Sequence, residues 1–217
     1  MKNDDSLLAF ASAYLDALRL GSGRAADKVT QSALDAGVPV SDIYLGIIQP
    51  TSYEIGRLWQ RNQFSVAQEH LATAIIERQM GELHPLFRPL RQKPKTLVIG
   101  CVDQEVHRVG VRMVADFFEQ DGWTVHYLGA SVPTPEFVAI AREVEADLIG
   151  LSSQTVYHLP AIQTFLHELD AHGLLGIPVM AGGLPFVINP EIYRAIGVTF
   201  TGTDAREAVR KANELVG

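Results

Sequence analysis

Two side chains in the stretch GCVDQEVHRVG, residues 100–110, could bind and tune a metal. Glu105 and His107 are two residues apart, and Gly110 follows three residues later. A neutral imidazole is a good transition-metal ligand, and a nearby carboxylate can hold its second ring nitrogen and fix its tautomer. We therefore predict that His107 is the metal ligand and that Glu105 orients it. Gly110 would let a large ligand lie close to the backbone.

Two further features close apolar segments later in the chain. Ser152 lies near the end of DLIGLSS (147–153), and Gly182-Gly183 ends IPVMAGG (177–183). A glycine pair leaves a slot where side chains would otherwise stand, and the Ser152 hydroxyl would point into it. Each feature has an ordinary explanation, because a lone loop histidine is usually a surface residue and Gly-Gly is usually a turn. Their joint placement at successive strand ends indicates a ligand site.

Alternating strands and helices must position these residues. Residues 96–217 predict strands at 96–101, 124–130, 147–153, 177–183 and 198–203, and helices at 108–121, 133–145, 159–173, 189–196 and 204–216. Strands rich in Val, Ile and Leu that alternate with helices indicate a parallel sheet covered on both faces. We expect an α/β, flavodoxin-like or Rossmann-like doubly wound domain, which binds ligands at the carboxyl ends of its strands.

Residues 1–80 contain no convincing strand. Their apolar residues recur every three or four positions, which predicts helices at 5–20, 23–36, 40–61 and 65–80. Ser41 and Ser65 look like helix N-caps, and Ser65 with Gln68 fits a capping box. Short turns between the helices favour an antiparallel four-helix bundle. A proline-rich linker at 81–95 would join this bundle to the α/β domain at 96–217.

Composition limits the classes of function. The chain has 217 residues, of which 47% are hydrophobic and 20% charged, and a net charge of −7. It can bury a core, but it lacks the basic face of a nucleic-acid binder. One cysteine, Cys101, excludes a disulfide framework. Because no signal pattern and no apolar run of about 20 residues is present, we expect a cytoplasmic protein without membrane or nucleic-acid partners.

Residues 96–217 resemble the cobalamin-binding domain of B12 proteins. The resemblance rests on the E-x-H-x-x-G motif, the later serine and the glycine pair about thirty residues beyond it. It implies that His107 replaces the cofactor's own dimethylbenzimidazole as the lower cobalt ligand, and that the displaced nucleotide tail enters the slot. The residues that we assign to the cofactor in this domain are Glu105, His107, Arg108, Val109, Gly110, Ser152, Gln154, Thr155, Gly182 and Gly183.

Two positions depart from that family's pattern. Glu105 stands where Asp is usual, and Gln154 stands where the family's S-x-L motif has an apolar residue. The polar Gln154 would reshape the tail pocket.

The helical half offers a second set of candidates in GRLWQRNQFSVAQEHLA, residues 56–72. Trp59 lies near the end of one expected helix, and Glu69 and His70 lie in the opening turns of the next. The pattern W-x9-E-H before a cobalamin domain resembles the B12-dependent photoreceptors, the light-responsive carotenoid-gene repressors and their relatives without a DNA-binding domain. The resemblance implies that these three side chains cap adenosylcobalamin. The alternative is a half-buried Trp packed between helices.

The photoreceptor resemblance implies a sensor and not an enzyme. Light would break the cobalt–carbon bond, and the conformational change would pass to a signalling partner or to another copy in a homo-oligomer. Gln60 replaces a histidine that is common in the repressor branch, so His70 or water would be the upper ligand after photolysis. The photocobilin subgroup adds a bilin. Gln154, Tyr157 and His158 could line a pocket for biliverdin, or could be ordinary polar loop residues.

A corrinoid methyl carrier of a methyltransferase system is the alternative function. Such carriers also pair a helical bundle with a cobalamin domain, but they must open the upper face to partner enzymes and have no need of an adenosyl cap. On the strength of the Trp-Glu-His set, we expect a photoreceptor.

Overall fold

The computed structural model describes residues 2–88 and 92–216. Two compact units make up the chain, Met1–Arg88 and Pro89–Gly217. The last α-helix of the first unit ends at Leu83, inside the predicted linker at 81–95, and a short 3₁₀ helix follows it there. Residues 89–91 of that linker lie outside the described residues. The predicted domain boundaries stay predictions. Within the described residues, no helix is long and apolar enough to cross a membrane.

The first unit is helical, as expected. Its elements are α1 (Lys2–Arg19), α2 (Gly23–Asp35), α3 (Val40–Ile43), the π-helix η1 (Tyr44–Ile48), α4 (Gln49–Gln60), α5 (Val66–Leu83) and the 3₁₀ helix η2 (His84–Leu86). The apolar faces meet in a core that includes Tyr14, Ile47, Ile48, Ile76 and Met80. The segments α3, η1 and α4 follow one another without a break, so they correspond to the helix predicted at 40–61.

A proline explains why that long helix contains a π-helical turn. Pro50 has no N–H to donate to the carbonyl four residues earlier, and its ring would crowd that carbonyl in a regular α-helix. A π-bulge relieves the conflict. The hydroxyls of Thr51 and Ser52 donate to the carbonyls of Ile47 (2.6 Å) and Ile48 (2.8 Å), which satisfies two carbonyls beside the irregular turn.

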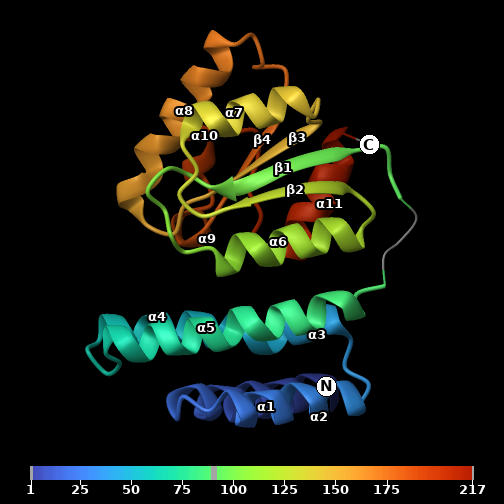
Figure 1. The fold of residues 1–217 in the computed structure, drawn as a ribbon, viewed down its shortest axis with the longest axis vertical. Coiled ribbons are helices and arrows are strands. Elements are labelled where there is room, and N and C mark those ends of the chain that lie inside the picture. The colour runs from blue at the N-terminus through green and yellow to red at the C-terminus, as the bar shows by residue number, and fades with distance from the viewer. Residues whose placement is uncertain (1, 89–91, 217) are drawn as a thin grey trace. The chain divides into compact units, whose positions relative to one another are not determined.

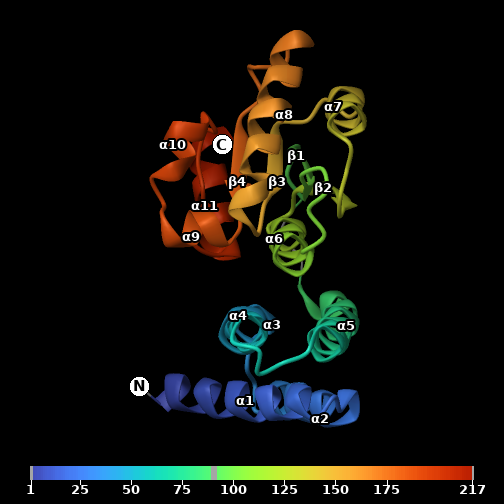
Figure 2. The same ribbon diagram turned by 90° about the vertical axis from the view of Figure 1, so that its left-hand side faces the viewer.

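The second unit alternates strands and helices. Its elements are β1 (Thr96–Cys101), α6 (Val109–Gln120), β2 (Thr124–Gly129), α7 (Thr134–Glu143), β3 (Leu148–Ser152), η3 (Val156–His158), α8 (Leu159–Ala171), β4 (Val179–Gly182), α9 (Leu184–Ile188), α10 (Ile192–Ile196) and α11 (Ala205–Val216). The strands pair in parallel in the order β2-β1-β3-β4. Helices α7 and α8 cover one face of the sheet, and α6 and α11 cover the other (Figures 1 and 2). The doubly wound fold class is confirmed.

Aromatic residues anchor both faces of this sheet. Phe137 and Phe165 pack edge to face, with ring centroids 5.0 Å apart, in the core beneath α7 and α8. Phe118 and Trp123 make a similar contact at 5.2 Å on the α6 side. Because both faces are buried at β1, β3 and β4, these strands consist mostly of apolar residues, whereas the edge strand β2 is only partly buried.

Three details of the sequence prediction are wrong. The segment 198–203 forms a single bridge, Met180 to Phe200, instead of a fifth strand, because the following residues already cap α11: Glu207 N donates to Asp204 Oδ1 at 2.8 Å. The helix predicted at 189–196 begins only at Ile192, as α10, and α9 precedes it unpredicted; proline disfavours helical angles in the residue before it, and Asn189 precedes Pro190. The third helix begins after Pro39, so Ser41 is not its N-cap.

Candidate functional site

The carboxyl ends of three neighbouring strands form one rim of the sheet. Cys101, the last residue of β1, pairs with Ser152 of β3, and Ser152 pairs with Gly182 of β4. The loops that leave these strands carry the predicted site residues of the α/β unit. Parallel pairing therefore brings together residues that are far apart in the chain, from Cys101 to Gly182.

The carboxylate of Glu105 is the centre of this rim. It is fully buried, and each oxygen accepts two hydrogen bonds. One oxygen accepts from His107 Nδ1 at 2.5 Å and from the His107 amide at 3.0 Å. The other accepts from the Gln154 amide at 2.7 Å and from His158 Nδ1 at 2.9 Å. The loops after β1 and β3 are thus joined through one side chain.

The charge of Glu105 determines the histidine tautomers. Burial raises the pKa of its carboxyl, but the hydrogen bonds from the side chains of His107 and His158 and from two amides outweigh burial, and the net pKa lies well below its ordinary value. An ionised carboxylate only accepts, so both histidines carry a proton on Nδ1. A neutral His107 then has its metal-binding lone pair on Nε2, and its side chain is 52% exposed.

The glycine pair lies beside the end of β3. Gly183 has φ +116°, and a Cβ built on it would lie 2.0 Å from the Ser153 carbonyl oxygen. The backbone there tolerates only glycine. A Cβ on Gly182 would meet nothing within 4 Å, so open space adjoins this residue at the rim. Ser152 is 8% exposed and directly opposite Gly182 in the sheet register.

The loop after β3 carries four further predicted residues. Gln154 bonds to Glu105 through its amide, and its side-chain oxygen accepts from the Leu184 amide at 3.4 Å. Thr155 contacts His158, with Oγ1 and Nδ1 3.3 Å apart. Tyr157 is 86% exposed. His158 is therefore directed at Glu105, a role that the sequence analysis did not predict.

The remaining residues of the motif lead into α6. Arg108 is at the N-cap position of this helix, Val109 begins it, and Gly110 is in its first turn. A Cβ on Gly110 would meet nothing within 4 Å, so the helix start is open to a ligand at this point.

The helical unit contains Trp59, Glu69 and His70. Trp59 is in the last turn of α4 and 46% exposed, and the other two lie in the first turns of α5. Glu69 accepts from His70 Nδ1 at 2.6 Å and from the Thr73 hydroxyl at 2.9 Å. The side chain of His70 is 75% exposed. Trp59 is thus a half-buried residue near the end of its helix.

Sequence and fold comparisons place the chain among known proteins. Residues 95–210 match the B12 binding domain, and residues 11–84 match a second model of the same description. The chain belongs to the B12-binding family. It is 35% identical to dimethylamine corrinoid protein 3 of Methanosarcina mazei over 166 residues, which is 75% of this chain and 98% of that protein.

Solved structures of low sequence identity share the B12-binding fold. The monomethylamine corrinoid protein of Methanosarcina barkeri has a TM-score of 0.86 at 19% identity, covering 96% of this chain and 99% of that one. The methanol:cobalamin methyltransferase complex of the same organism has a TM-score of 0.53 at 17% identity, covering 96% and 80%.

The predicted photoreceptor function is wrong. The relatives of this B12-binding protein are methylamine corrinoid proteins, which agree with the alternative function and not with a light sensor. The motif at the lower face resembles both classes, so it could not separate them. The Trp-Glu-His set led to the photoreceptor prediction, and these relatives do not support that reading of it.

The rim has the donors that a corrinoid requires. The Glu105–His107 pair offers an imidazole of fixed tautomer, and the backbone at Gly182 and Gly110 leaves room. Thr201 adds an independent indication: its Oγ1 is the buried side-chain polar atom that lacks a hydrogen-bond partner among the described residues. A buried hydroxyl left unsatisfied usually has a ligand or water as partner. The residues present therefore fit the cofactor.

Thr201 was missed by the sequence analysis. It follows Phe200, which bridges to Met180 of β4, so it belongs to the same rim as Gly182. The rule that ligands bind at the carboxyl ends of strands would have found it in the predicted strand 198–203.

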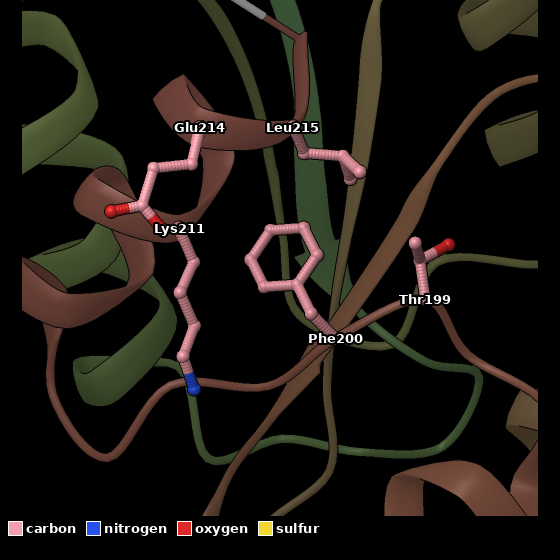
Figure 3. A pocket seen from close by; sticks show the side chains of 5 residues that line it. All are labelled: Thr199, Phe200, Lys211, Glu214 and Leu215. Atoms are coloured by element: carbon pink, nitrogen blue, oxygen red, sulfur yellow. The ribbon is translucent and has the colours of Figure 1, made fainter.

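A pocket lies on the side of Thr199 and Phe200 that faces α11. It is lined by Thr199, Phe200, Lys211, Glu214 and Leu215, beside α11 (Figure 3). None of the predicted site residues lines it. Lys211 Nζ donates to the Thr201 carbonyl at 2.8 Å and pairs with Glu207 at 3.1 Å, so its charge is already used within the fold.

The thiol of Cys101 has low reactivity. Burial raises the pKa of its thiol to about 12, the nearby charge of Glu105 adds to the effect, and Arg108 opposes it. The reactive thiolate is therefore scarce at neutral pH, which disfavours this residue as a covalent attachment point for a bilin.

Proposed function

We propose that this chain is the corrinoid subunit of a methyl-transfer system, which carries a methyl group between partner methyltransferases. The observation that supports this most strongly is the 35% identity to a dimethylamine corrinoid protein over 98% of that protein's length. A methylated amine is accordingly the candidate methyl source. The chain would carry the group and leave catalysis of each transfer to its partners.

The rim residues have separate tasks in this proposal. When bound, the corrinoid supplies a cobalt that can accept and release a methyl group. His107 would offer Nε2 to that cobalt, while Glu105 keeps the ring in one tautomer and orientation. Ser152, Gly182 and Thr201 would accommodate the nucleotide tail, since they combine a slot without side chains with two hydroxyl groups.

Exposed side chains of the helical unit would be available to a partner enzyme. A carrier has to expose the reactive face to partner enzymes, and the half-exposed Trp59 and the exposed His70 are compatible with that need. The specific form of the cofactor follows from the function: a methyl carrier does not require adenosylcobalamin or biliverdin, and both stay untested predictions, as does self-association.

The test is methyl transfer by the reconstituted full-length chain. The protein is loaded with hydroxocobalamin, reduced, and supplied with ¹³C-labelled mono-, di- or trimethylamine together with the matching Methanosarcina methyltransferase. We expect protein-bound label from one amine, and its loss in His107→Ala. His172→Ala, at the C-cap of α8, is the matched control and should retain label. Absence of label with all three amines, from protein that holds stoichiometric cobalamin, would refute the methylamine assignment.

A further inference from the structure

Two histidines from different loops share one buried carboxylate. His107 lies between β1 and α6, whereas His158 ends η3, which follows β3, and the two Nδ1 atoms approach opposite oxygens of Glu105. The position of His158 is 53 residues from Glu105 in the chain. This contact therefore exists only because β1 and β3 are neighbours in the sheet.

The second oxygen of Glu105 needs its own donors. A carboxylate is attached through a terminal torsion with broad minima, so two bonds on one oxygen do not by themselves fix its plane. The Gln154 amide and His158 hold the other oxygen at 2.7 Å and 2.9 Å. Of these two donors, only His158 is a side chain, so it is the one that a substitution can remove.

His158 is itself held in place. Its amide donates to the Thr155 carbonyl at 3.3 Å, and Thr155 Oγ1 lies 3.3 Å from its Nδ1. Pro160 follows it in the first turn of α8. The side chain is 26% exposed, against 52% for His107. Of the two histidines that contact the carboxylate, His158 is thus the more buried and His107 the more exposed to solvent.

We infer that His158 is a positioning residue for His107, acting through the shared carboxylate of Glu105. This inference rests on the proposed function, because it assumes that His107 binds cobalt. His158 holds the carboxylate plane, the carboxylate holds Nδ1 of His107, and Nε2 of His107 is thereby presented in one direction. The role that a biliverdin pocket would have given His158 is not needed to explain its placement.

The first readout needs no cofactor. In the apo full-length protein, ¹⁵N NMR of the histidine rings reports which nitrogen carries the proton. We expect His107 to be the Nδ1–H tautomer in the wild type and a tautomer mixture in His158→Ala. His158→Asn should restore the wild-type signal, because the Asn amide places a donor near the position of Nδ1. Unfolding curves for all variants show whether each is folded.

A matched control removes a histidine of similar bonding from the same unit. His172 Nδ1 contacts the Glu168 carbonyl at 2.9 Å, at the end of α8. His172→Ala should leave the His107 signal unchanged. If His158→Ala also leaves it unchanged while folded, the positioning role is excluded.

The second readout is cobalamin binding, measured by titration with hydroxocobalamin and absorption spectra. Outer partners of a metal ligand are typically worth 10–100-fold in affinity, so we expect His158→Ala to weaken binding about tenfold. His158→Asn should bind as the wild type does. A wild-type affinity and spectrum for His158→Ala would overturn the inference alone. A wild-type spectrum for His107→Ala would instead refute the proposed ligand, whatever His158 does.

Discussion

Each unit contains a short contact between a glutamate and a histidine that are near one another in sequence. Glu105 and His107 are on the sheet rim, and Glu69 and His70 open helix α5. Their carboxylate–imidazole contacts are nearly the same length, 2.5 Å and 2.6 Å. The surroundings differ. Glu105 is fully buried, whereas the side chain of Glu69 is 23% exposed, and the Thr73 hydroxyl that also donates to it is only four residues away.

The difference shows that long-range partners, and not adjacency in sequence, make the first pair rigid. Glu105 receives donors from two loops, and a buried acceptor or donor that loses its partner costs free energy. An exposed ion pair contributes little, about 0–1 kcal/mol, and water readily replaces either partner. Only the rim pair can hold an imidazole in one orientation for a metal.

Substitution of a glycine with positive φ gives the largest expected difference in stability between the two units. Gly183→Ala places a Cβ 2.0 Å from the backbone oxygen of Ser153 at φ +116°. Strain of this kind costs about 1–3 kcal/mol, and the overlap adds to it, so we expect a loss of about 3 kcal/mol in the free energy of unfolding. Urea denaturation measures the change.

The helical unit supplies the matched substitution. Gly21 also has positive φ, +61°, but its added Cβ would meet the end of the flexible Leu71 side chain. Gly21→Ala should therefore cost about 1 kcal/mol, the ordinary penalty of the left-handed region. Equal losses for Gly21→Ala and Gly183→Ala would mean that the rim backbone is not specially constrained.

The carboxylates offer the next largest contrast. In Glu105→Gln, an amide group replaces one oxygen and faces donors from His107, His158 or the two amides. Because a buried donor left unsatisfied costs about 1–3 kcal/mol, we expect a loss of about 2 kcal/mol in unfolding free energy. Glu69→Gln should change it by less than about 0.5 kcal/mol, as is usual for surface positions.

Thermal and urea denaturation of the apo variants separates these outcomes. A loss for Glu69→Gln as large as that for Glu105→Gln would contradict the view that only the rim pair is rigid. Cobalamin titration of the same proteins should show weaker binding for Glu105→Gln alone.

Most secondary structure was predictable from sequence because its causes are local. The four strands β1–β4 and most of the helices lie within two or three residues of their predicted positions. The rim location of Glu105, His107, Ser152 and the glycine pair followed from the fold class. The contact between Glu105 and His158 was not predictable, since it joins residues 53 apart and depends on loop conformation.

The upper face of the cofactor was the weakest part of the sequence prediction. The motif for the lower cobalt ligand is common to corrinoid proteins, so it does not indicate whether the upper ligand is a methyl or an adenosyl group. Helical spacing predicted that Trp59, Glu69 and His70 lie near one another. Spacing alone does not fix the orientation of exposed side chains, whereas burial does. The relatives among methylamine corrinoid proteins supplied the information that this region of the sequence lacked.

Two serines of the helical unit provide the smallest expected contrast: one caps a helix, and the other only has the sequence pattern of a cap. Both Ser41 and Ser65 resemble N-caps in sequence. Ser65 forms a complete capping box, with Oγ accepting from the Gln68 amide at 3.2 Å and Gln68 Oε1 accepting from the Ser65 amide at 2.9 Å. Ser41 lies inside α3, which begins after Pro39.

Ser65→Ala should therefore lower the free energy of unfolding by about 1 kcal/mol, the usual value of a cap, whereas Ser41→Ala should have almost no effect. Urea denaturation of the two variants measures the difference. A cap involves residues at most three positions apart, so sequence can propose it, but the proline before Ser41 moved the helix start and removed its role. If Ser41→Ala lowers the free energy of unfolding as much as Ser65→Ala does, the helix begins at Ser41 in solution. Local sequence would then determine the helix ends of this unit less firmly than long-range contacts determine the structure of the sheet rim.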